Sequence, residues 1–257
     1  MQFLQMQVDM NRLVLFFLFP FLFVCSEGEA KGDVYVVVVG VSGYQEIPSL
    51  VLPEKDAKAI AALYKLQTKH VILITGKYAT KAVLLKSLKD QFSRAKEDDM
   101  VVFAFSGHGY ADGICPYDMP AKGGKGITYR EIQSILKQSR ASRKVLFLDA
   151  CFSGGIRGNA SGIHSHAVNT PDVLLFLSSR TGEASIESPF MANGVFTTYL
   201  LRGLRGGADA DKNRKITAKE LFRYVSRKVG EKTDGKQHPV MWGKFEDDTV
   251  LFDWNRR

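Results

Sequence analysis

The chain has 257 residues, of which 45% are hydrophobic and 11% aromatic, and this composition excludes an intrinsically disordered protein. Its length suits one large domain with a substantial core. The formal net charge of +8 comes from scattered lysines and arginines, without a long basic run or a basic motif interleaved with aromatic residues. A solvated basic surface is therefore expected, and no nucleic-acid partner.

The N-terminal segment predicts export. Residues 13–24 form an unbroken apolar run, which fits the core of a signal peptide but falls short of the roughly 20 residues that span a bilayer. We therefore expect a signal peptide over residues 1–26, with Met10 as an alternative start, and no stable membrane span. The expected location is periplasmic or extracellular. Cys25 leaves a lipid anchor open as an alternative to free secretion.

Strand and helix patterns alternate along the rest of the chain. Continuous apolar runs predict strands that are buried on both faces, and helical spacing predicts amphipathic helices between them. Strands are expected at 34–41, 71–75, 100–105, 144–150, 173–179 and 247–252, and helices at 53–66, 80–95, 127–138, 194–205 and 217–229. This alternation predicts an α/β fold with a mostly parallel sheet of about six strands and helices on both faces. Residues 154–172 lack periodicity and predict a mobile surface loop.

Two strand ends carry the residues of greatest chemical interest. Strand 100–105 runs into SGHG, which contains His108, and strand 144–150 runs into CFSGG, which begins with Cys151. In a parallel sheet, reactive groups gather at the carboxyl ends of the strands, and neighbouring strands are about 4.8 Å apart. If these two strands are neighbours, a thiol and an imidazole come within reach of each other. A cysteine after an apolar strand is often only part of the core, but a histidine between two glycines is harder to explain by packing.

These segments resemble the caspase and metacaspase family of cysteine peptidases. The matching stretches are FAFSGHG around the histidine, LFLDACFSGG around the cysteine, and the opening VVVVGVSGYQEIPSL. The resemblance continues through NGVFTTYLLRGL and the closing HPVMWG and DDTVLF, so that it spans residues 33–252. It implies one caspase-like peptidase domain that hydrolyses protein or peptide substrates without a cofactor.

The resemblance also assigns roles to the two residues. Cys151 would attack the peptide carbonyl and form a thioester, while His108 would protonate the leaving amine and later activate water. The backbone amides of Gly109 and Cys151 would hold the oxyanion, a contact worth roughly 3 kcal/mol. No third member of a triad is evident, and the resemblance implies a dyad. No G-x-S-x-G elbow is present, which argues against a serine hydrolase.

Specificity depends on Asp149, two residues before the nucleophile. The same acid in the D-x-C pattern of metacaspases lines the primary specificity pocket, so the resemblance implies cleavage after Arg or Lys. Arg180 follows the strand predicted at 173–179 and is the alternative determinant, because it would either pair with Asp149 or bind an acidic side chain. A plain structural acceptor remains a further interpretation of Asp149. A catalytically idle binding or scaffolding module is the main alternative to a peptidase.

Three other features have competing interpretations. Residues 209–220 resemble a calcium loop, but Thr217 and Glu220 also form the T-x-x-E pattern of a helix capping box, so no metal site is assigned. His164 and His166 have no partner at metal-ligand spacing and are read as exposed loop residues, and Arg157 in the same loop is a candidate point of self-cleavage. Cys115 suggests the hypothesis of a redox switch through a disulfide with Cys151.

Overall fold

The computed structural model describes residues 32–110, 112–151, 173–180, 183–186, 191–243 and 246–256. These residues belong to one compact unit, Lys31–Arg257. The segment interpreted as a signal peptide and the loop at 154–172 lie outside the described residues, as do Arg157, His164 and His166. Within the described ranges, no helix is both long enough and apolar enough to cross a bilayer.

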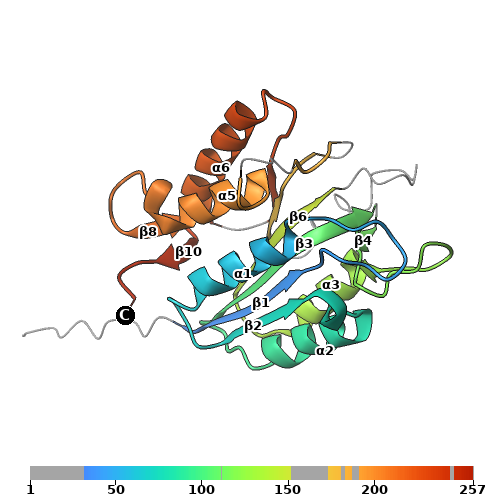
Figure 1. Ribbon diagram of the computed structural model, residues 1–257. Helices are drawn as coiled ribbons and strands as arrows, with labels where there is room; N and C mark the ends of the chain where they lie inside the picture. The colour runs from blue at the N-terminus through green and yellow to red at the C-terminus, as the bar shows by residue number, and fades with distance from the viewer. Residues whose placement is uncertain are drawn as a thin grey trace, which may run out of the picture. The chain divides into compact units, whose positions relative to one another are not determined.

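A mostly parallel sheet forms the centre of the fold (Figure 1), as expected from the alternation of strands and helices. Its main path runs in the order β2-β1-β3-β6-β7-β9, and every pairing along it is parallel except that of β9. The short strands β4 and β5 extend it from the end of β3. The bounds are β1 (Val34–Gly40), β2 (Val71–Thr75), β3 (Met100–Tyr110), β4 (Gly113–Ile114), β5 (Ile127–Thr128), β6 (Arg143–Cys151), β7 (Val173–Leu177) and β9 (Val240–Trp242).

The strand expected at 247–252 does not belong to the central sheet, in which the sequence pattern placed it. It forms β10 (Val250–Asp253), which pairs antiparallel with β8 (Lys215–Thr217) in a separate two-stranded sheet. Its apolar side chains are buried because β10 packs against the helical layer of the core. The last strand of the central sheet is instead β9, which is short and only half-buried and therefore lacks the continuous apolar run of the other strands.

Helices cover both faces of the sheet, as predicted. The helices α1, α5 and α6 pack on one face and α2 and α3 on the other (Figure 1), so that each face has its own hydrophobic cluster. The helix expected at 194–205 ends at Arg202 and continues as a π-helical turn, η2 (Gly203–Gly207). The bounds are α1 (Pro53–Tyr64), α2 (Lys81–Phe92), α3 (Tyr129–Gln138), α5 (Val195–Arg202) and α6 (Ala218–Lys232), with a 3-10 turn η1 (Gly76–Tyr78) before α2.

Helix α1 has an unusual buried face. Proline opens the helix in its first turn, where its missing N–H costs nothing. The apolar residues at helical spacing on its inner face are buried, and they are Ala57, Ile60, Ala61 and Tyr64. Asp56 is buried among them with only 2% of its surface exposed. A carboxyl group on the core face of a helix needs hydrogen-bonding partners there, and these partners belong to the site described next.

Candidate active site

The two residues singled out at strand ends are brought together by strand pairing. Strands β3 and β6 are parallel neighbours, and the register pairs Ser106 with Asp149 and His108 with Cys151. The sequence alone could only assume that these two strands are neighbours, and the pairing confirms it. The backbones at positions 108 and 151 therefore lie side by side at the carboxyl edge of the sheet, about 4.8 Å apart as in any ladder. The side chain of Cys151 is outside the described part of the structure.

The segment that follows β1 holds His108 in place. The backbone N–H of His108 donates to Tyr44 Oη at 2.6 Å, and the two rings lie 5.0 Å apart between centroids. The Nε2 atom lies 2.9 Å from the carbonyl oxygen of Pro48. Because a carbonyl only accepts hydrogen bonds, Nε2 carries the proton in this contact, and in the neutral ring Nδ1 keeps its lone pair. Sequence reasoning missed this orienting contact, because a backbone carbonyl has no residue-type signature.

The backbone around Gly109 faces the strand that carries Cys151. The carbonyl of His108 accepts from the N–H of Cys115, and the N–H of His108 bonds to Tyr44, so both groups point away from β6. Backbone groups of successive strand residues point to opposite sides. The amide of Gly109 therefore points towards β6, the strand that carries Cys151.

Asp149 is buried and held by hydroxyl groups. Its Oδ1 accepts from Ser185 Oγ at 2.5 Å, and its Oδ2 accepts from Thr197 Oγ1 at 2.7 Å and from the Thr197 amide at 3.3 Å. Thr197 lies in the first turn of α5, where a helix favours negative charge. Burial nevertheless dominates and raises the pKa of Asp149, while these hydrogen bonds oppose the rise. Among the described residues, Asp149 therefore bonds to Ser185 and Thr197, and the pairing with Arg180 considered above is not formed.

A second carboxyl group, Asp56, joins this site from α1. It accepts from Ser106 Oγ at 2.9 Å, from Asn193 Nδ2 at 2.8 Å and from the amide of Gly194 at 3.1 Å. Burial and the nearby charge of Asp149 raise the pKa of Asp56 to about 7. The sequence analysis did not identify Asp56, although a carboxylate within the apolar stripe of a helix was a readable signal.

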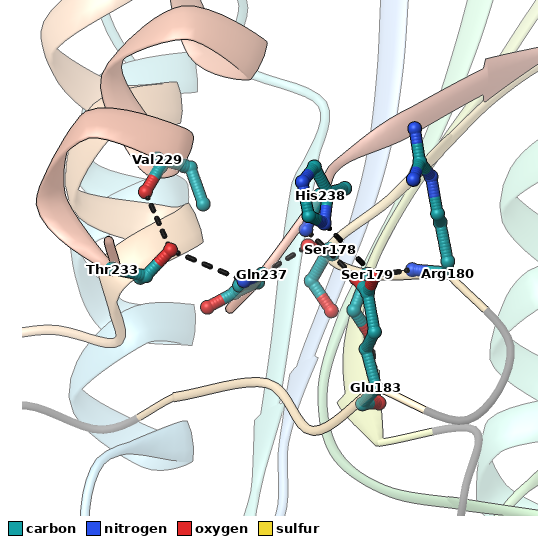
Figure 2. Close-up of polar contacts among 8 residues, drawn as sticks. All are labelled: Ser178, Ser179, Arg180, Glu183, Val229, Thr233, Gln237 and His238. Atoms are coloured by element: carbon teal, nitrogen blue, oxygen red, sulfur yellow. Dashed lines mark hydrogen bonds and ion pairs between the residues drawn. The ribbon is translucent and has the colours of Figure 1, made fainter. Parts of the chain in front are cut away.

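Arg180 lies on the exposed side of the segment after β7. Its backbone N–H donates to Glu183 Oε2 at 3.2 Å, and Figure 2 shows its guanidinium extending away from the neighbouring polar contacts. Glu183 also accepts from the amide of His238 at 2.8 Å and lies 2.9 Å from His238 Nδ1. Gln237 donates to the carbonyl of Ser178 at 2.9 Å. These contacts connect the end of β7 to the segment that leads into β9.

Cys115 lies beside His108 in the backbone, but its thiol is buried. Only 4% of the residue is exposed, and burial raises the pKa of the thiol to about 12. Since the thiolate is the reactive species, such a group reacts slowly with oxidants and disulfides. Burial therefore opposes the hypothesis of a redox switch at this residue.

The loop at 209–220 contains the capping box. Thr217 and Glu220 bond reciprocally at the start of α6, as their spacing predicted. Oxygen atoms of Asp209, Asp211 and Glu220 lie within 4.8 Å of one another. Both aspartates accept a hydrogen bond from the backbone N–H of Asn213, and Asp209 also accepts one from the backbone N–H of Arg214. The helix cap thus accounts for Glu220.

Comparisons with known proteins agree with this architecture. Two similar solved structures are protein GSU0716 from Geobacter sulfurreducens (18% identity, TM-score 0.65, 86% of this chain and 98% of that chain) and caspase-1 from Spodoptera frugiperda (17% identity, TM-score 0.62, 88% and 92%). No curated protein matches the sequence. The family model described as the caspase domain matches residues 33–250. The chain therefore belongs to the caspase-domain family of cysteine peptidases.

Proposed function

We propose that the protein is an active cysteine endopeptidase that uses a dyad of Cys151 and His108. The observation that carries this proposal is the register of β3 and β6, which pairs these two positions at the carboxyl edge of the sheet. The contact between His108 Nε2 and the Pro48 carbonyl supports it, since it selects the tautomer with a basic Nδ1. A peptidase needs such a base, because a thiol with a pKa near 8.5 is mostly protonated at neutral pH.

The reaction follows from these assignments. The Cys151 thiol transfers its proton to the imidazole, and the sulfur adds to the carbonyl carbon of the scissile bond. The resulting oxyanion accepts from the amides of Gly109 and Cys151. His108 then protonates the leaving amine, which departs and leaves a thioester. A water molecule, deprotonated by His108, hydrolyses the thioester and regenerates the free thiol.

We further propose that the enzyme cleaves after Arg or Lys, and that Asp56 acts together with Asp149 in selecting the basic side chain. The two carboxyl groups lie next to the paired positions 108 and 151 and have no cation of the described chain as a partner. Burial raises the pKa of both carboxyl groups, and the charge of Asp149 raises that of Asp56 further, because two ionised carboxylates in a buried site repel each other. A guanidinium or ammonium group that enters between them removes this repulsion and makes charge-assisted hydrogen bonds.

Export of the protein is also proposed, on the basis of the apolar run at 13–24. Expression in a bacterium with a secretory pathway, followed by determination of the N-terminal residue by mass spectrometry, tests it. Cleavage near residue 26 and recovery outside the cytoplasm are expected. A lipid-modified Cys25 at the new N-terminus identifies an anchored form, and an intact N-terminus in the cytoplasm contradicts export.

The decisive experiment for the activity is a panel of fluorogenic peptides that end in Arg, Lys, Asp or Asn before the reporter group. The wild-type protein is expected to cleave the Arg and Lys peptides, whereas Cys151→Ala and His108→Ala lower kcat/KM at least about 10³-fold. Cys115→Ala serves as the matched control and retains activity. Cleavage of the Asp peptide instead assigns the specificity to a basic group such as Arg180. No turnover of any peptide, by protein tested with and without reductant and calcium, contradicts the peptidase proposal and favours a binding module.

A further inference from the structure

A cavity lies at the opposite edge of the sheet from His108 and Cys151. Its volume is about 110 Å³, which is enough for several water molecules. Val34, Met100 and Arg143 line it, and these are the paired first residues of β1, β3 and β6. The proposed catalytic residues stand at the other end of β3 and β6. The remaining wall comes from Tyr64, Gln67, Lys215, Val250, Leu251, Phe252, Asp253 and Arg256.

Positive charge gathers around this cavity. Arg143, Lys215 and Arg256 line it, against one carboxylate, Asp253. Burial and the charge of Arg256 lower the pKa of Arg143, while Asp99 and Asp98 oppose that effect. Among the described residues, no ion pair involves Arg143, Lys215 or Arg256. The cations of the ion pairs are other lysines and two histidines.

The two guanidinium groups have donors to spare. Arg143 donates to the carbonyl of Asp98 at 2.7 Å, and Arg256 donates to the carbonyl of Gly32. A guanidinium has five N–H donors in a planar fork that matches a carboxylate. The cavity therefore has a cationic side with the geometry that binds anions, and the repulsion between the two arginines favours an anion there.

A buried hydroxyl group in the same wall lacks a partner. Tyr64 is only 1% exposed, and its Oη makes no hydrogen bond with any residue that the structure describes. A buried hydroxyl without a partner is costly, and such groups in a native structure call for an explanation. Gln67 is not a partner for this hydroxyl, because both ends of its side-chain amide bond to the backbone of Asp253. This oxygen has almost no accessible surface, so a molecule in the cavity contacts the ring of Tyr64 and not its hydroxyl.

We propose that this cavity binds a small organic carboxylate with a short apolar body. Its carboxylate interacts with Arg143 and Arg256, and its apolar body lies against the side chains of Val34, Met100 and Phe252. The mostly apolar wall favours this class over inorganic phosphate, whose charge needs polar groups on all sides. The site is separate from the proposed catalytic edge, so the inference holds whether or not the chain is an active peptidase.

Butyrate is a suitable probe, with inorganic phosphate and butanol as the comparison compounds. The Cys151→Ala protein is titrated with each compound at constant ionic strength, and thermal unfolding and calorimetry are measured. Butyrate is expected to bind saturably and to raise Tm, more strongly than phosphate or butanol. Absence of saturable butyrate binding, or tighter binding of phosphate or butanol, overturns the assigned ligand class.

Variants then locate the site. Arg143→Met and Arg256→Met are each expected to weaken butyrate binding roughly tenfold, the loss of about one charge-assisted hydrogen bond. Arg140→Met, at an exposed arginine outside the cavity, is the matched control. Equal butyrate affinity in the control and the cavity variants places the ligand elsewhere and overturns the proposal.

Discussion

The carboxyl groups of Asp56 and Asp149 lie together beside one glycine, Gly194, although the two acids come from distant parts of the chain. A Cβ atom placed on Gly194 would lie 3.1 Å from Asp149 Oδ2 and 3.3 Å from Asp56 Oδ2. Ser106, which bonds to Asp56, is paired with Asp149 in the β3–β6 ladder. The two acids thus form one buried unit. On the strands, Ser106 and Asp149 come two residues before His108 and Cys151.

If the acid pair selects a basic side chain, removing one charge lowers activity chiefly through substrate binding. Asp149→Asn is expected to lower kcat/KM for Arg peptides roughly 100-fold, since an unpaired buried cation is costly. The loss falls mainly on KM. Steady-state kinetics of the variant measures it, and Asp90→Asn on the exposed face of α2 is the control. An unchanged KM in Asp149→Asn leaves only a structural role for this acid.

The same pair predicts a pH-dependent KM. Burial and mutual repulsion raise the pKa of Asp56 to about 7, so the pair takes up a proton as the pH falls through this range. A protonated pair binds a cation poorly. KM for Arg peptides is therefore expected to rise as the pH falls from about 8 to about 5, with a smaller change in kcat. Kinetic measurements across this range check it, and a KM that is flat, or that rises with pH, contradicts it.

Stability has the opposite pH dependence. The pKa of Asp56 is raised on folding from 3.8 to about 7, so its contribution to stability is fully present below pH 3.8 and is lost as the pH rises through about 7. Asp56→Asn removes the charge, and at pH 8 it is expected to raise the free energy of unfolding by roughly 1 to 3 kcal/mol.

The difference between Asp56→Asn and the parent protein is expected to shrink towards pH 5. Urea unfolding of both proteins at the two pH values, in a Cys151→Ala background that prevents self-cleavage, measures this difference. A difference that is the same at both pH values rules out titration of Asp56 as its source.

Tyr44 is predicted to position His108. In Tyr44→Phe the backbone N–H of His108 loses its acceptor, which is worth about 1 kcal/mol. We expect kcat to fall about fivefold with little change in KM, because the hydroxyl bonds to the backbone of His108, the proposed base. Tyr78→Phe, at an exposed tyrosine, is the control. A matching rise in KM would show instead that Tyr44 contributes to the substrate pocket.

The local patterns predicted the elements better than their assembly. The apolar runs at β1, β2, β3, β6 and β7 were readable because a strand buried on both faces must be apolar along its whole length. The strand β9 was missed because it is half-buried and short. The run at β10 was recognised as a strand, but its partner, β8, depends on a non-local pairing that no periodicity encodes.

The sequence by itself determined that a histidine and a cysteine follow two buried strands, because residue type and strand periodicity are local properties. Only the tertiary structure decided that those strands are neighbours and that positions 108 and 151 share a register. It also decided that the Pro48 carbonyl faces His108 and that Asp56 reaches Asp149. These relationships arise from packing between distant segments, where a backbone carbonyl or a single buried acid acquires its chemistry from its neighbours rather than from its own sequence context.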